Sequence, residues 1–122
     1  MTYKKKAIEL AKKIIREKGI CEKCGRRKEH GYQMHGSHIF SINASAELAA
    51  DLDNLQCLCA GCHKMKNDSW HESPLEQWEW FNKKFPGRYE RLNKRRQKIV
   101  KANEQFWQEK YNNLKKYVRN NN

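Results

Sequence analysis

Apolar residues recur at helical spacing in the first part of the chain, which predicts a helix there. The helix covers residues 3–18 and ends before Gly19, and its apolar face consists of Ala7, Leu10, Ala11, Ile14 and Ile15. Short apolar runs follow. Tyr32 to Ile42 contains a strand-like stretch around His38-Ile39-Phe40, and a second run lies at Leu55–Leu58. We expect a loop between these two strands, with one helical turn near residues 44–50.

The pattern in the rest of the chain is helical. Gly61 to Lys66 has the character of a helix start. Ser73-Pro-Leu-Glu76 then combines an N-cap, a proline at the first helical position and a capping-box glutamate. The helix that begins there should end at Pro86-Gly87, because proline and glycine both interrupt helices. Two more helices are predicted, a basic one from Arg88 to about Lys101 and another from Asn103 to Val118.

These elements predict an α+β fold, a small ββα core wrapped by N- and C-terminal α-helices. We expect a single domain over residues 1–122, composed of an N-terminal basic helix (1–19), the core (20–72) and basic C-terminal helices (73–118). Only 38% of the residues are hydrophobic, so the core is small and needs a cross-link. No run approaches the roughly 20 apolar residues of a membrane helix, and no signal peptide is evident. We therefore expect a cytoplasmic protein with no membrane partner.

Positive charge is concentrated at the two ends of the chain. The net charge of +12 divides into +5 for residues 1–20, −3 for residues 21–81 and +10 for residues 82–122. Basic segments of this kind are either solvated helix faces or surfaces that bind phosphates without regard to base sequence. Thirteen cations in the last 41 residues are more than solubility requires. We therefore expect a nucleic acid as the partner.

The cysteines predict a structural zinc site. Cys21-x2-Cys24 and Cys59-x2-Cys62 form two paired-thiolate turns, and four thiolates grouped in this way suit tetrahedral Zn²⁺. Disulfides are the alternative, but a fifth cysteine is left over and no secretion signal supports them. The fifth cysteine, Cys57, is interpreted as a small buried side chain on the second strand, with zinc ligation in place of Cys59 as the minor alternative.

The histidines carry a resemblance to a known family. His35-Gly-Ser-His38-Ile39, followed by Asn54-Leu-Gln-Cys-Leu-Cys59-Ala-Gly-Cys62-His63-Lys-Met-Lys-Asn67, resembles the HNH nucleases, also called His-Me finger or ββα-metal nucleases. The chain looks closer still to the phage NinG (Rap) recombination nucleases, through the HxGH form and the basic aromatic segment Trp80-Phe-Asn-Lys-Lys-Phe-Pro-Gly-Arg88. The resemblance implies a zinc-stapled ββα-metal core that hydrolyses DNA in a bacterial or phage-infected cell, with branched or recombination DNA as a candidate substrate.

The same resemblance implies roles for three residues. His38 is the expected general base, His63 the expected ligand of a catalytic Mg²⁺ or Mn²⁺ ion, and the amide of Asn54 is expected to hold the loop that orients His38. A neutral imidazole can accept a proton from water near pH 7, and one divalent ion can stabilise both the phosphate and the leaving group. Asn67 lies one helical turn after His63 and is the expected second ligand from that helix, with the adjacent Asp68 as a less favourable substitute.

One position departs from the family pattern. Many members have aspartate or histidine immediately before the general base, where it binds the metal, but here that residue is Ser37. On a strand, His35 would face the same way as Ser37, so we expect His35 to supply the missing ligand. A water held by Ser37, or a weakened metal site, remains the alternative.

Several cations are candidates for contact with DNA phosphates rather than with bases. They are Lys64 and Lys66 after the second cysteine pair, and Arg88, Arg91, Arg95 and Arg96 on the basic C-terminal helix. The chain is therefore interpreted as a metal-dependent DNA endonuclease of low sequence specificity. A non-catalytic zinc-stapled DNA-binding module and an RNA-directed protein are the alternatives. Cleavage pattern, oligomeric state (monomer or dimer) and protein partners stay open.

Overall fold

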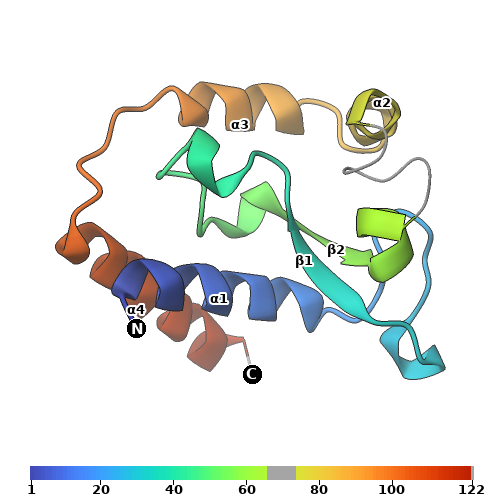
Figure 1. Ribbon diagram of the computed structural model, residues 1–122, viewed down its shortest axis with the longest axis horizontal. Helices are drawn as coiled ribbons and strands as arrows, with labels where there is room; N and C mark the ends of the chain where they lie inside the picture. Colours follow the sequence, from blue (N-terminus) through green and yellow to red (C-terminus); the bar gives the residue numbers. More distant parts are fainter. Residues whose placement is uncertain (66–73, 122) are drawn as a thin grey trace.

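The computed structural model describes residues 1–65 and 74–121, with the backbone alone for residues 64 and 65. Its centre is an antiparallel hairpin of β1 (Met34–His38) and β2 (Leu55–Cys59). Four helices surround the hairpin: α1 (Tyr3–Arg16), α2 (Pro74–Lys84), α3 (Arg88–Arg96) and α4 (Glu104–Asn120). Figure 1 shows α1 and α4 along one side of the hairpin and α2 and α3 along the other. This arrangement confirms the predicted α+β fold.

Helix α1 forms the main support of the hairpin. The hydroxyl of Thr2 caps it by accepting a hydrogen bond from the backbone N–H of Lys5 at 3.2 Å. The helix ends at Arg16, two residues before the predicted end, and Gly19 then turns the chain with a φ of +75°. Ala7 and Ala11 are fully buried, and their small side chains allow α1 to pack closely against α4 and both strands. No helix in the described part of the chain is long and apolar enough to span a membrane.

The first strand lies within the predicted stretch of residues 32–42 but ends before its expected centre. It covers Met34–His38, so Ile39 and Phe40 fall outside it, while the prediction for β2 is confirmed. Ile39 packs in a core, where it is only 7% exposed. In the sequence, an apolar residue buried in this way looks the same as one buried in a strand. The predicted helical turn near residues 44–50 is also displaced, since short 3₁₀ helices lie at Ile42–Ala44 and Leu52–Asn54.

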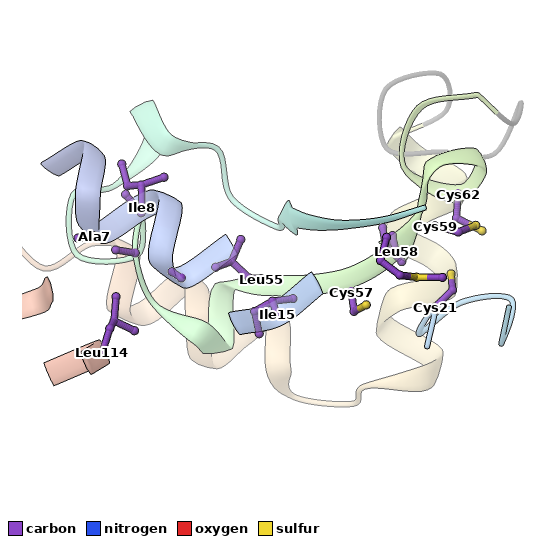
Figure 2. Packing of buried hydrophobic residues seen from close by; sticks show 14 of the residues in the cluster. Ala7, Ile8, Ile15, Cys21, Leu55, Cys57, Leu58, Cys59, Cys62 and Leu114 are labelled. Carbon is purple, nitrogen blue, oxygen red and sulfur yellow. The ribbon is translucent and has the colours of Figure 1, made fainter. Parts of the chain in front are cut away.

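Two separate cores hold the helices to the hairpin. The first joins α1, α4 and both strands, and Figure 2 shows its side chains, including Ile8, Ile15, Leu55 and Leu114. The second joins the loop after β1 to α2 and α3, through the buried residues Ile39, Leu48, Phe81 and Leu92. The strands themselves contribute to the first core, so the packing against α1 and α4 gives the hairpin the support that a sheet of only two strands needs.

Helix α3 is shorter than predicted. It ends at Arg96 rather than near Lys101, and Ile99 in the following segment is 98% exposed. Continuing the helix would place Lys98 one turn after Lys94, so two like charges would repel each other. The β-branched pair at 99–100 also has a lower helix propensity, and no core contact compensates for it.

Gly36 is the point of closest approach between β1 and α1, and we predict that adding one methyl group there is costly. A Cβ on Gly36 would lie 2.7 Å from the carbonyl oxygen of Lys12 and 2.8 Å from its Cα. Gly36→Ala must push the helix away from the strand, so the free energy of unfolding of the zinc-loaded protein should fall by about 1–3 kcal/mol. Urea denaturation followed by circular dichroism measures the change.

Ser37→Ala is the matched control on the adjacent residue. The Ser37 hydroxyl is buried and has no hydrogen-bond partner among the described residues. Its removal should leave the stability unchanged or slightly increase it, because an unpaired buried hydroxyl is unfavourable. Equal losses of stability in the two variants would contradict the interpretation of the Gly36 contact.

Candidate active site and metal centre

Four thiols gather at one end of the hairpin. One ligand atom from each of Cys21, Cys24, Cys59 and Cys62 lies within 4.8 Å of the others, and the sulfurs of Cys24 and Cys59 are 3.6 Å apart. A tetrahedron with Zn–S bonds of roughly 2.3 Å has sulfurs about 3.8 Å apart, so the cluster has the dimensions of a zinc site. Figure 2 shows the sulfurs of Cys21, Cys59 and Cys62 together, with Cys57 apart from them.

The first cysteine pair is held in a tight turn next to β2. The backbone N–H of Gly25 donates to the carbonyl of Cys21 at 3.0 Å, and the φ of Gly25 is +77°. The turn is fastened to β2 because the N–H of Glu22 donates to the carbonyl of Cys57, and the Glu22 carboxylate accepts from the N–H of Cys57. These bonds place the thiols of residues 21 and 24 beside those of residues 59 and 62.

The ionisation of the thiols is uneven. Burial raises the pKa of Cys62 and, to a lesser degree, that of Cys24. Burial also opposes ionisation of Cys59, but hydrogen bonds from the Cys62 backbone and neighbouring thiols lower its pKa to about 7. One thiolate therefore forms readily, whereas full deprotonation of the cluster requires the positive charge of a bound metal ion.

Cys57 does not belong to the thiol cluster. It is fully buried, and its thiol donates to the backbone carbonyl of Arg16 at 3.8 Å. Burial raises its pKa, as expected for a thiol that packs as an apolar side chain. The prediction of a small buried residue is confirmed.

His35 and His63 meet in a cleft at the same end of the hairpin. Their Nδ1 atoms are 2.8 Å apart, and the two rings are nearly perpendicular, at 82°. This is the distance of a hydrogen bond between the two rings, and it brings one nitrogen of each imidazole to the same place in the cleft. His35 comes from β1, and His63 comes from the short π-helical turn Gly61–Met65.

His38 lines the same cleft and is held by one backbone bond. Its Nε2 lies 2.8 Å from the carbonyl oxygen of Ala49. A carbonyl can only accept, so Nε2 carries a proton, and in the neutral ring Nδ1 keeps its lone pair. Burial lowers the pKa of His38 below its ordinary value, and repulsion from Lys12 adds to this, although the bond to Ala49 opposes both. The imidazole is therefore neutral at pH 7.

Asn54 connects the end of β1 to the loop that carries Ala49. Its Oδ1 accepts from the N–H of Phe40 at 2.9 Å, and its Nδ2 donates to the carbonyls of Phe40 and Leu48 at 2.9 and 3.0 Å. The side chain is fully buried. Its three bonds fix both the chain after His38 and the chain before Ala49, so the amide acts on the orientation of His38 through the backbone.

The cleft has a volume of about 720 Å³ and draws its walls from several elements. Besides the three histidines, its lining includes Lys12 and Arg16 of α1, Gln33 before β1, and Pro74 and Trp78 of α2. The sequence analysis did not single out Lys12 or Arg16. Their spacing of four residues places them on one helical face, but no local pattern indicates that this face meets β1.

Ser37 lies outside the cleft lining. It is 1% exposed and pairs with the buried Gln56 across the hairpin, whereas His35 is half-buried and reaches the cleft. Among the remaining predicted site residues, Lys66, Asn67 and Asp68 lie outside the described residues, and for Lys64 only the backbone is described.

The arginines of α3 contact carboxylates and carbonyls of the same chain. Arg88 is 13% exposed and donates to the backbone carbonyls of Asp53 and Leu55, with Glu22 at 3.8 Å. Arg91 pairs with Asp53, and Arg95 pairs with Asp51 and Glu47. Arg96 bonds to Asn93 and lies over the ring of Phe40. These internal partners compete with the predicted role of the four arginines in DNA binding.

The two buried cysteines of β2 allow a direct test of the zinc site. Cys59→Ser should release zinc and unfold the core, because binding of a structural zinc ion contributes about 10 kcal/mol or more. Cys57→Ala should keep one zinc ion per chain, since its thiol lies outside the cluster. Metal analysis and circular dichroism of both purified variants provide the measurement. Equal zinc content in the two variants would contradict the assignment.

Comparison with known proteins supports the HNH resemblance. Residues 21–69, less than half of the chain, match the model of the HNH endonuclease family. This segment contains the four clustered cysteines, Asn54 and the histidines of the cleft. No curated protein and no solved structure matches the chain. Residues 21–69 are therefore similar to an HNH endonuclease domain, and the thiol cluster within them has the dimensions of a zinc site.

Proposed function

We propose that this chain is a metal-dependent DNA endonuclease that cleaves phosphodiester bonds in the cleft beside β1. The convergence of His35 and His63, whose Nδ1 atoms lie 2.8 Å apart, carries this proposal. His38 lines the same cleft with a nitrogen able to accept a proton. The match of residues 21–69 to the HNH endonuclease family supports the reaction class.

In this proposal His38 is the general base. Its Nδ1 takes the proton from the water that attacks phosphorus, while the bond from Nε2 to Ala49 keeps the ring in the required tautomer. Asn54 maintains this bond by holding the chain after His38 and the chain before Ala49. Because burial lowers the pKa of His38, the ring is ready to accept a proton at neutral pH.

His35 and His63 are the proposed ligands of the catalytic metal ion, with Asn67 as a further expected ligand. When bound, the ion stabilises the charge on the phosphate and on the leaving oxygen. Imidazole nitrogens suit first-row transition ions better than Mg²⁺, which prefers oxygen ligands. We therefore propose that Mn²⁺ or Ni²⁺ supports cleavage at lower concentration than Mg²⁺ does.

The structure weakens the main support for a purely DNA-binding module. That alternative rested on Ser37 at the position where many family members have a metal ligand. Ser37 is buried away from the cleft, and His35 lies beside His63 instead. In this proposal His35 therefore supplies the metal ligand from β1 that Ser37 cannot.

Plasmid nicking by the zinc-loaded protein tests this proposal. Supercoiled plasmid should be nicked with Mn²⁺, Ni²⁺ or Mg²⁺ and left intact when no divalent ion is added to the zinc-loaded protein. His38→Ala should slow nicking by about 10²-fold or more, because it removes the general base. Zinc content and DNA binding should be unchanged, and gel quantification of nicked circles gives the rate. Nicking by His38→Ala at the wild-type rate would contradict the proposed mechanism.

Two other histidine variants sharpen the nicking test. His30→Ala is the matched control, since the His30 side chain is exposed and its ring lies 3.9 Å from the Glu29 carboxylate; this variant should nick normally. His35→Ala should raise the concentration of Mn²⁺ needed for half-maximal nicking.

A linear duplex and a branched junction of the same sequence test a second proposal. From the resemblance to NinG we propose selectivity for branched DNA, and equal cutting of the two substrates would contradict it.

The pH dependence of cleavage should reflect the environment of His38. The active form is the neutral imidazole, and burial together with Lys12 lowers the pKa of this group below 6.5. Under single-turnover conditions with saturating metal and DNA, the rate should rise with pH through a midpoint below 6.5 and be constant near pH 7. A midpoint above 6.5 would show that the ring is not held in the neutral form as described.

A further inference from the structure

Helix α1 contributes two cations to the cleft that holds the histidines. Lys12 and Arg16 lie four residues apart and both line it, together with His35, His38 and His63. Both residues precede the segment that matches the HNH family, which begins at residue 21. We propose that Lys12 and Arg16 form a phosphate-binding wall that positions DNA against the histidines. This inference rests on the proposed nuclease function.

The position of this wall is fixed by backbone contacts. Gly36 of β1 lies so close to Lys12 that a Cβ would be 2.7 Å from the Lys12 carbonyl oxygen. The Arg16 carbonyl accepts a hydrogen bond from the buried thiol of Cys57 on β2. Both residues are therefore anchored to the hairpin that carries His35 and His38. Cations held in this way can bind a phosphate without first ordering a loop, which favours positioning of the substrate.

The charge of the wall is available to a ligand. The Nζ of Lys12 lies 3.9 Å from the Oε1 of one carboxylate, that of Glu9 on the helix surface. The Glu9 side chain is 53% exposed. Among residues 1–65 and 74–121, no carboxylate lies within ion-pair distance of Arg16, and none lines the cleft. Cations in a cleft without acidic residues create a positive potential that attracts phosphates.

The arginines of α3 present the opposite case. Arg88, Arg91 and Arg95 each contact at least one carboxylate of the same chain. Binding a phosphate would require them to give up these partners, and the loss would offset part of the gain. The two basic regions therefore have different uses: α3 is held against the acidic loop before β2, and α1 faces the cleft.

DNA binding in the His38→Ala background tests the wall without interference from cleavage. Fluorescence anisotropy of the zinc-loaded protein with a labelled duplex, without added divalent ions and over a range of salt concentrations, gives Kd and its salt dependence. Lys12→Gln and Arg16→Gln should each raise Kd about 5- to 10-fold at physiological salt and lower the slope of log Kd against log salt by about 1. Arg16→Lys should restore most of the binding.

Lys13→Gln is the matched control, because it removes the same charge from an exposed neighbouring position on α1. It should change Kd less than twofold. Equal effects of the Lys12, Lys13 and Arg16 variants, with zinc content and thermal unfolding unchanged, would overturn the proposal. Such a result would mean that α1 attracts DNA through its total charge and not through two specific residues.

Cleavage assays in the wild-type background separate this proposal from the nuclease proposal. Under saturating metal, Arg16→Gln should raise KM more than it lowers kcat, as expected for a positioning residue, whereas the metal concentration for half-maximal nicking should stay the same. If the wild type cuts plasmid and Arg16→Gln has normal Kd and KM, the phosphate-binding wall is contradicted and the nuclease proposal is retained. If the wild type never cuts but Arg16→Gln still loses binding and salt dependence, the wall stands and the nuclease proposal fails.

Discussion

The four-thiol cluster is the constraint on which the rest of the molecule depends. A two-stranded hairpin is not stable alone, and this chain has few apolar residues with which to build a large core. The cluster joins the turn at residues 21–24 to the end of β2 and the turn that follows it. It also sets the position of the metal-ligand candidates, because His63 follows Cys62 directly and His35 is adjacent to Met34, the partner of Cys59 in the hairpin register. Metal binding at the thiols and the geometry of the histidines are therefore linked through a few backbone residues.

Local sequence was sufficient to predict those parts of the site that depend on short spacing. The paired cysteines and the second strand involve chemistry that the neighbouring residues reveal, whereas the role of Asn54 in holding a loop followed from the resemblance to the HNH nucleases. The first strand was expected around residues 38–40 but ends at His38, because the apolar Ile39 packs in a core rather than in the sheet. A pattern of burial alone does not distinguish these two environments. The location of Ser37 in the interior, and of His35 in the cleft, depends on where the hairpin ends, which the period of two does not specify.

Charge was the least predictable property, because its use depends on contacts between distant parts of the chain. The slightly acidic centre and the basic C-terminal segment look independent in the sequence, yet Glu47, Asp51 and Asp53 accept ion pairs from α3 more than 35 residues later. These pairs hold α3 over the loop that contains Ala49, and this loop in turn positions His38. Part of the positive charge that suggested a DNA surface thus supports the general-base candidate through the backbone of that loop.

The arrangement places the proposed chemistry between two differently constructed supports. On one side, α1 contacts the hairpin through Gly36, where the absence of a side chain lets the backbones touch. On the other side, α3 contacts the loop through long arginine side chains and carboxylates. The first support is short and steric, so it fixes the distance between the helix and His35 or His38 closely. The second combines partly exposed ion pairs, which salt weakens, with the buried core that contains Leu48 and Leu92 and with the bond from Asn54 to Leu48. The loop that orients His38 therefore keeps its apolar and hydrogen-bonded contacts when salt screens its ion pairs.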